Sequence, residues 1–367
     1  MNNNILILFD TFVGVILIPI GLFINALNKY ILHFVRPKPR GRLLIKLLGA
    51  GNYLPLKSKL SAEPFDILTV RSNLKTLEYF GIGNRIYLIN DKNILLLFIS
   101  AFSIFFKLIL QNYEQVINLE MESKFAKFLS LISPTKGLSG ISSHNKSYLD
   151  CYIYDSYLVS PLLMGRGEIV SQLVRFKPET NNYLLALVRS HQEKFKKKFL
   201  LNKSLKHIVI FPSCSSTDPL RRLKEKDWRL ILSYLVKSKN VKNITIIFSS
   251  KNDPQFKFFE DILMSDQIDK LHLKITNFKD FVYWVKKSDL ILSVDSQALH
   301  IAQLYKKKSV VFYGPTSPFG INLEETTYPV SLSLSCSPCT HKYLKLPCNN
   351  SAPCMNINKK DLDILNI

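Results

Sequence analysis

Short apolar runs that alternate with helical or turn-rich segments are the feature of this sequence that most restricts its fold. The first half contains four such runs, at 42–46, 65–70, 86–89 and 116–119. The second half contains four more, at 207–211, 244–248, 290–294 and 309–313. Strands that alternate with helices form βαβ units and parallel sheets. The sequence therefore predicts two open α/β domains.

A polar, basic segment at 190–206 separates the two halves. The chain has 367 residues, 47% of them hydrophobic, which is too long for one ordinary core and too apolar for disorder. Open α/β sheets bind ligands outside the carboxyl ends of their strands, so we expect the domains to face a common cleft. The predicted parts are an apolar segment with a basic linker, two Rossmann-like domains and a cysteine-containing tail, at 1–40, 41–190, 205–335 and 336–367.

The charge balance predicts anionic partners. Lysine and arginine total 49 against 28 acidic residues, a net charge of +21 at pH 7. Phospholipid, nucleic acid and nucleotide phosphate all suit this charge. The basic residues are scattered, however, and no strand interleaves aromatic and basic side chains as base-stacking surfaces do. We therefore expect no nucleic acid partner.

The segment 5–27 is apolar, with Asp10 as its one charged residue, and basic residues follow it at Lys29, Arg36, Lys38, Arg40 and Arg42. As a helix it is long enough to cross roughly 30 Å of hydrocarbon, and the basic flank places the rest of the chain in the cytoplasm. Two residues argue against a membrane-spanning helix. The carboxylate of Asp10 would be costly inside lipid, and Pro19 interrupts helical hydrogen bonding. The alternatives are a helix that enters one leaflet and a helix packed on the soluble body. A second apolar stretch, 94–110, contains Lys107 and is expected to be a buried helix of the first domain.

Polar residues follow the predicted strand 207–211. The loop 212–217 offers hydroxyls, among them Ser213 and Thr217, and Arg221 and Arg222 come next, near a helix start. Hydroxyls, backbone N–H groups and arginines are the groups that hold a diphosphate. The alternative is a solvated basic helix start.

Two further loops follow strands in the second half. Asp295 and Ser296 come directly after 290–294 and can cap a helix in which His300 lies about one turn inside. The alternative here is a capped helix with a core histidine. After 309–313, the turn at Gly314, Thr316 and Ser317 presents N–H and hydroxyl donors to an anion.

Together, three motifs resemble glycosyltransferase family 9, the lipopolysaccharide heptosyltransferase family. They are LIKLLGAGN at 44–52, DSQALH at 295–300 and FYGPTSP at 312–318. The resemblance implies a GT-B fold, which is two Rossmann-like open parallel-sheet domains facing a cleft, here with an N-terminal apolar helix. It also implies an inverting transfer from a nucleotide-diphosphate sugar, ADP-heptose being the best-known donor, with no cofactor required. The domain at 41–190 would bind the acceptor and the domain at 205–335 the donor.

The resemblance also implies roles for single residues. Arg222, with Arg221 beside it, would contact the donor phosphates, and Asp295 would approach the donor sugar. Ser296, His300 and the Thr316 turn would hold the diphosphate. Gln297, where the family has glycine, would narrow the donor pocket.

One departure concerns the general base. The family pattern has Gly-Asp after the first strand, whereas this chain has Gly51-Asn52, a pair that suggests a subgroup. Asparagine cannot accept a proton at neutral pH, so Asn52 can position an acceptor hydroxyl but not deprotonate it. Glu120, followed by Glu122, is the expected local substitute. The alternative is a non-catalytic protein that binds a nucleotide sugar or a glycan.

The last cysteines, Cys336, Cys339, Cys348 and Cys354, follow the pattern C-x2-C-x8-C-x5-C. Four soft ligands at short spacings suit a structural zinc ion, and free thiols or disulfides are the alternative.

From the family resemblance, the apolar N-terminal segment and the basic charge, we expect an enzyme at the cytoplasmic face of the inner membrane. Its partners would be a nucleotide-sugar donor, a glycolipid or lipopolysaccharide-core acceptor, and the anionic membrane surface.

Overall fold

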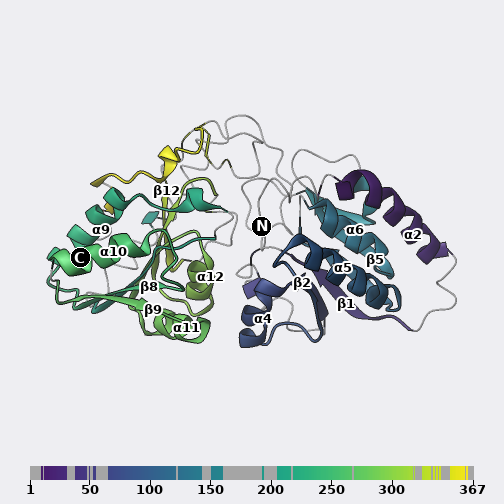
Figure 1. Cartoon of the computed structure of the whole chain (residues 1–367), viewed down its shortest axis with the longest axis horizontal. Helices are drawn as coiled ribbons and strands as arrows, with labels where there is room; N and C mark the ends of the chain where they lie inside the picture. Colours follow the sequence, from purple (N-terminus) through teal and green to yellow (C-terminus); the bar gives the residue numbers. More distant parts are fainter. Residues whose placement is uncertain are drawn as a thin grey trace. The chain divides into compact units, whose positions relative to one another are not determined.

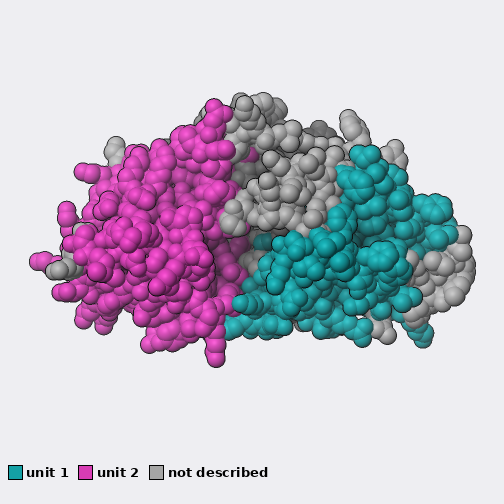
Figure 2. All heavy atoms as spheres, in the orientation of Figure 1, with its two compact units in different colours: residues 1–162, 169–172 teal, residues 163–168, 173–367 magenta. Residues whose placement is uncertain are grey.

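The structure is a computed structural model, and it forms two compact units (Figure 2). Unit 1 comprises residues 1–162 and 169–172, and unit 2 comprises 163–168 and 173–367. The structure describes residues 10, 12–30, 38–47, 49, 53–54, 65–120, 123–142, 150–159, 192–193, 205–215, 218–266, 268–316, 318, 325–331, 334, 336–337, 339, 348–359 and 361–362. The predicted boundary at 190–206 falls almost wholly outside these residues and stays a prediction.

Unit 1 is built on a six-stranded parallel sheet with the order β3-β2-β1-β4-β5-β6 (Figure 1). Its strands are β1 (Arg40–Ile45), β2 (Phe65–Val70), β3 (Ile86–Ile89), β4 (Tyr113–Asn118), β5 (Thr135–Ser142) and β6 (Ser156–Val159). Its helices between strands are α4 (Leu74–Phe80), α5 (Ile94–Ile109), α6 (Lys124–Ile132) and α7 (Asp150–Ile153). Strand β1 lies between β2 and β4, with Leu44 opposite Ile67 and Ile117.

Unit 2 contains a second six-stranded parallel sheet, with the order β12-β11-β10-β7-β8-β9. Its strands are β7 (His207–Phe211), β8 (Asn243–Phe248), β9 (Leu271–Ile275), β10 (Leu290–Val294), β11 (Ser309–Tyr313) and β12 (Thr327–Ser331). Its main helices are α9 (Glu225–Lys237), α10 (Phe256–Asp266), α11 (Phe278–Lys287) and α12 (Gln297–Leu304).

Both sheets have the same topology. Numbered by their order within each unit, the strands of both sheets run 3-2-1-4-5-6, the order of dinucleotide-binding Rossmann folds. The order reverses between β1 and β4 in unit 1 and between β7 and β10 in unit 2. Ligands of such sheets bind outside the carboxyl ends of the strands at this switch point. The topology therefore identifies two places at which to look for a site.

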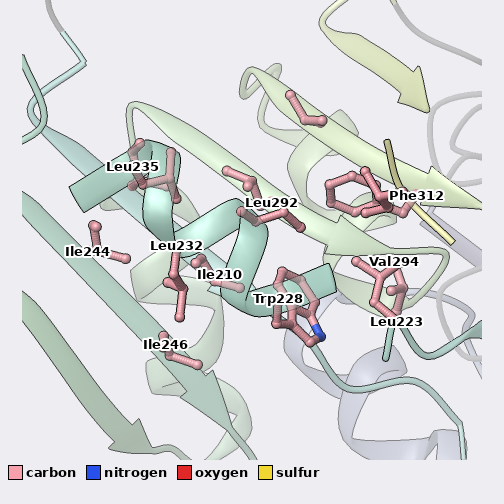
Figure 3. Packing of buried hydrophobic residues seen from close by; sticks show 14 of the residues in the cluster. Ile210, Leu223, Trp228, Leu232, Leu235, Ile244, Ile246, Leu292, Val294 and Phe312 are labelled. Carbon is pink, nitrogen blue, oxygen red and sulfur yellow. The ribbon is translucent and has the colours of Figure 1, made fainter. Parts of the chain in front are cut away.

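The core of unit 2 explains why the central strands of this unit have continuous apolar sequences. Helix α9 places Trp228, Leu232 and Leu235 at helical spacing against the sheet, where they pack among side chains of the central strands (Figure 3). The strand residues in this view include Ile210, Ile244, Ile246, Leu292, Val294 and Phe312. A parallel sheet covered on both faces buries both sides of each strand, which removes the alternation of apolar and polar residues.

The N-terminal apolar segment is helical. A π-helical turn, η1 (Val13–Leu17), continues into α2 (Ile18–Tyr30), and together they form the one helix in the described part of the chain that is long and apolar enough to cross a membrane. About a fifth of this helix, 22%, is buried inside unit 1.

Candidate functional site

The carboxyl ends of β7, β10 and β11 bring together the loops that the sequence predicted as a donor site. Phe211 is paired with Ser293, and Val294 with Phe312, so the three neighbouring strands end at one edge of the sheet. Ser213 follows β7 by two residues, Asp295 follows β10 directly, and Gly314 follows β11 directly. This edge includes the switch point of unit 2.

Arg221 ties two of these loops together. Its Nη1 donates to the backbone oxygen of Asp295 at 2.9 Å and lies 3.5 Å from the Asp295 Oδ2. Its Nε lies 3.1 Å from the Oδ2 of Asp218. The contacts of the Arg221 guanidinium are therefore with the loops after β7 and β10, which it holds together. Asp218 was not predicted, and its three-residue spacing from Arg221 was the available signal.

Arg222 is the second cation at this edge. It is partly buried, and its Nε has no hydrogen-bond partner among the described residues. Burial raises the pKa of the nearby Cys214 thiol, and the charges of Arg222 and Arg221 oppose that rise. Both guanidinium groups thus lie close to the loop after β7, where an anion would meet them.

Ser296 caps helix α12. Its Oγ accepts from the backbone N–H of Ala298 at 3.3 Å and lies 3.1 Å from the Oγ of Ser293. His300 is buried in the first full turn of the same helix. The hydroxyl of Ser296 is thus engaged in capping, while the N-terminal end of α12 points its partial positive charge toward the sheet edge.

The turn at Gly314 is supported by the C-terminal segment of the chain. Ser337 Oγ donates to the Gly314 oxygen, and Cys339 N donates to the Pro315 oxygen at 2.9 Å. A Cβ added at Gly314 would overlap Met355 and lie 2.9 Å from the Cys354 Sγ. The tail packs directly on the turn, so a side chain at position 314 would force Met355 and Cys354 to shift.

Several buried polar atoms at this edge lack a hydrogen-bond partner among the described residues. They include Ser213 Oγ, Arg222 Nε, Tyr313 Oη and Thr316 Oγ1. Burial raises the pKa of Tyr313 well above its ordinary value, and the nearby Asp295 charge raises it further, so this phenol stays protonated. Since buried polar groups in proteins are nearly always bonded, their concentration here suits a polar ligand.

The switch point of unit 1 carries a buried ion pair. Lys46, directly after β1, donates through Nζ to the Glu120 Oε1 at 2.5 Å, and the backbone N–H of Leu47 donates to the same oxygen at 2.9 Å. Glu120 follows β4 by two residues. The structure therefore places Glu120 at the expected edge and adds Lys46, which was not predicted, although a lysine at the end of an apolar strand was a signal for a buried partner.

A chain of buried polar contacts continues from this pair. Asn118 Oδ1 accepts from the N–H of Glu120 at 3.0 Å, and Asn118 Nδ2 donates to the Tyr154 hydroxyl at 2.7 Å. The hydroxyl of Tyr53 donates to the Lys46 oxygen. These contacts hold the Lys46 and Glu120 side chains in one arrangement at the sheet edge.

Some predicted site residues lie outside the described residues. These are Asn52, Glu122, Thr217 and Ser317. Their roles stay predictions.

The four C-terminal cysteines are free thiols. Burial raises the pKa of Cys354 to about 11 and also raises that of Cys339, and in both cases the neighbouring cysteines add to the rise. The cysteines therefore lie near one another. Among the described residues, however, no group of three or more Cys, His, Asp or Glu side chains is placed to hold a metal ion. A structural zinc ion at these cysteines stays a prediction.

Two Rossmann-like parallel sheets of the same topology are the architecture of a GT-B glycosyltransferase. The sequence profile of glycosyltransferase family 9 (heptosyltransferase) matches residues 102–349, and the chain belongs to this family. The profile match includes every described residue of the candidate donor site and Glu120, whereas Lys46 and the Gly51-Asn52 pair precede it.

Solved structures share the fold. The Escherichia coli heptosyltransferase WaaC with ADP is 14% identical, with 79% of this chain and 92% of that chain covered and a TM-score of 0.55. The E. coli ADP-heptose lipopolysaccharide heptosyltransferase II is 13% identical, with coverages of 80% and 91% and a TM-score of 0.51. A family 9 glycosyltransferase from Veillonella parvula is 11% identical, with coverages of 79% and 85% and a TM-score of 0.52. No curated protein matches the sequence.

Proposed function

We propose that this glycosyltransferase transfers a heptose or a similar sugar from a nucleotide-diphosphate donor to a lipopolysaccharide-core or other surface-glycan acceptor. The observation that carries the proposal is the edge of unit 2, where two arginines and the start of α12 lie beside buried polar atoms that have no hydrogen-bond partner in the described part of the chain. The WaaC structure contains ADP, so an ADP-linked sugar is the first donor to test.

The proposed chemistry is an inverting displacement at the anomeric carbon. The acceptor oxygen attacks that carbon, the bond to the diphosphate breaks, and the acceptor proton passes to a base. Arg222 and the N-terminal end of α12 stabilise the charge that develops on the diphosphate. Asp295 approaches the donor sugar, and Arg221 keeps its loop in place.

For the base, we propose Glu120, with Asn52 positioning the acceptor hydroxyl. Glu120 lies at the switch point of unit 1, which suits an acceptor-binding domain. Its Oε1 is bonded to Lys46, so the pair must loosen, or the other oxygen must act, when the carboxylate takes a proton. Glu120→Gln tests this role. Because the substitution also leaves the Lys46 charge buried without its partner, circular dichroism must first show that the variant is folded. The folded variant should bind the donor normally while transfer falls strongly.

A donor screen tests the function itself. The full-length protein in detergent is supplied with ADP-, UDP-, GDP- and CDP-linked sugars, with and without a lipid-glycan extract, and released nucleotide diphosphate is measured. One donor should support acceptor-dependent release. Arg222→Ala and Asp295→Ala should abolish it, whereas Arg229→Ala, an exposed arginine of α9, should not.

A second candidate is a non-catalytic protein that binds a nucleotide sugar or a glycan. The Gly51-Asn52 pair favours it, because asparagine cannot serve as the base. Tight binding of a nucleotide diphosphate by calorimetry, with no release from any donor, would support this alternative.

We also propose that the enzyme works at the cytoplasmic face of the inner membrane. The apolar helix from η1 to α2 and the net charge of +21 support this location. Membrane fractionation of cells that express the full chain tests it: the protein should sediment with inner membranes.

A further inference from the structure

Helix α5 has an apolar outer face, although the sequence predicted a buried helix. Leu97, Ile104 and Leu108 are buried against unit 1. On the opposite side, apolar side chains are between 43% and 73% exposed, at Leu95, Phe98, Ile99, Phe102, Phe106 and Leu110. Surface helices normally turn polar residues outward, and an apolar patch of this length marks an interaction surface.

The helix from η1 to α2 has the same two-sided character. Val13, Ile18 and Gly21 are buried against unit 1, and α2 contacts α6. A Cβ on Gly21 would lie only 3.1 Å from Phe128 and Leu131 of α6. Its outer side exposes Phe12, Val15, Ile16, Ile20, Phe23 and Tyr30.

Polar contacts hold the N-terminal helix along the domain. Asp10 Oδ1 accepts from the N–H of Phe125 at 3.1 Å, at the start of α6, and Lys29 Nζ lies 2.6 Å from the Asp155 Oδ1. The carboxylate that argued against a membrane span is thus a capping group for α6. A helix that crossed the bilayer would lose both contacts and its packing on α6.

The two apolar faces belong to one layer of unit 1. Helix α5 connects β3 to β4 and α6 connects β4 to β5, two crossovers that progress in the same direction across the sheet, so their right-handedness puts both helices on one face. Helix α2 packs beside α6 on this face, and Figure 1 shows the three helices together. The outer sides of α5 and α2 therefore face away from the same side of the sheet.

We propose that this surface, the α5–α2 face, docks unit 1 flat on an anionic lipid bilayer. Exposed lysines border it at Lys92, Lys107 and Lys124, and Lys107 is the one charged residue in 94–110. Anionic headgroups complement these charges, whereas a second copy would bring two cationic rims together. Helix α5 has 16 residues, which extend about 24 Å, too short to cross the hydrocarbon core but suited to lying in the interface.

The docking deepens the proposed function, because unit 1 contains the proposed acceptor-binding domain and a lipid-linked acceptor lies at the bilayer surface. The contact itself needs no substrate. It can therefore be measured whether or not the protein transfers a sugar.

Vesicle sedimentation of the full-length protein tests the proposal. Vesicles of phosphatidylethanolamine and phosphatidylglycerol should bind the protein more tightly than phosphatidylcholine vesicles. Phe102→Ser combined with Phe106→Ser should weaken binding by about tenfold or more, since two large apolar groups no longer enter the interface. Met264→Ser with Tyr283→Ser, which alters exposed apolar residues of unit 2, is the matched control and should bind like the wild type.

Tryptophans at the two ends of α5 test the orientation. Leu95→Trp and Phe106→Trp lie about 16 Å apart along the helix axis, and both should be quenched to a similar extent by lipids brominated near the headgroup. The proposal would be overturned if the wild type did not bind anionic vesicles or if the folded α5 variant bound as tightly as the wild type. A dimer in sedimentation velocity that Phe102→Ser dissociates, without any change in vesicle binding, would also overturn it. Circular dichroism confirms that each variant is folded.

Discussion

At the scale of single residues, the paired charges at the switch point of unit 1 are the feature with the largest expected energetic effect. The side chains of Lys46 and Glu120 are 2% and 9% exposed, so neither charge is solvated by water. Removal of one partner from such a pair leaves the other charge buried alone, and this costs far more than the loss of a surface pair.

We predict that Lys46→Met lowers the free energy of unfolding by about 3–5 kcal/mol. Lys46→Met combined with Glu120→Gln should recover part of this loss, because neither side chain is then left as a buried charge without a partner. Lys29→Met, which breaks the half-exposed pair with Asp155, should cost less than about 1 kcal/mol. Urea unfolding measures all three variants. Equal losses for Lys46→Met and Lys29→Met would show that the Lys46–Glu120 pair is not buried.

A second residue-scale prediction concerns Cys354. With its pKa raised to about 11, the thiol is protonated at neutral pH, and its reactive thiolate form appears only as the pH rises toward 11. Alkylation of Cys354 by iodoacetamide at pH 8 should be at least about a hundredfold slower than that of a cysteine peptide and should increase with pH up to about 11. Mass spectrometry of the alkylated chain follows this site. A rate that levels off near pH 8 would contradict the prediction.

At the scale of elements, β5 differs from the other central strands because it is rich in glycine and serine. The Tyr154 ring lies over Gly140, where an added Cβ would overlap it, whereas the nearest atom to a Cβ on Gly137 is 3.8 Å away. The ring carries the hydroxyl that accepts from Asn118. Because Gly140 of β5 has no side chain, the Tyr154 ring has space to lie against the strand. In that position its hydroxyl can accept from Asn118, next to Glu120.

Gly140→Ala should accordingly destabilise unit 1 by about 1–3 kcal/mol, because a rigid ring must move. Gly137→Ala, in the same strand, has space for the methyl group and serves as the control, with a change within about 0.5 kcal/mol. Thermal unfolding followed by circular dichroism compares the two variants. A similar loss in both would mean that the Tyr154 ring does not occupy the place next to Gly140.

The sequence predicted eight strands, and each is present within three residues of its expected bounds. It did not predict β5, β6, β9 and β12. Strands β6, β9 and β12 lie at sheet edges, where burial does not demand a long apolar run, and β12 contains Pro329, which only an edge strand readily tolerates. Strand β5 was not predicted because its glycines and serines interrupt the apolar run that marks the other central strands.

The candidate donor site was predictable in outline because parallel strands end at one edge, so residues that directly follow strands must meet. The contacts between loops were not predictable, since the Arg221–Asp295 link joins residues 74 positions apart and depends on the folded path of both loops. Lys46 was missed for the same reason, as its partner comes from another strand.

At the scale of the whole molecule, each unit has its own hydrophobic core, and the proposed donor edge belongs to unit 2 alone. The chain has two tryptophans, Trp228 and Trp284, and both lie in unit 2. Tryptophan fluorescence therefore reports on the unfolding of the unit that is proposed to bind the donor.

We predict that ADP at a hundred times its dissociation constant stabilises unit 2 by about 2.7 kcal/mol. The midpoint of thermal unfolding seen by tryptophan fluorescence should rise in the wild type and not in Arg222→Ala. An equal rise in the variant would place the nucleotide elsewhere.

The central claim is that the edge of unit 2 binds and activates a nucleotide-diphosphate sugar for transfer. The most direct test is kcat/KM for nucleotide-diphosphate release with the preferred donor and a lipid-glycan acceptor, compared among wild type, Arg222→Ala and Arg229→Ala. The account predicts a loss of about a hundredfold or more for Arg222→Ala, as expected when one group that stabilises developing charge is removed, and none for Arg229→Ala. Unchanged release by Arg222→Ala would contradict it.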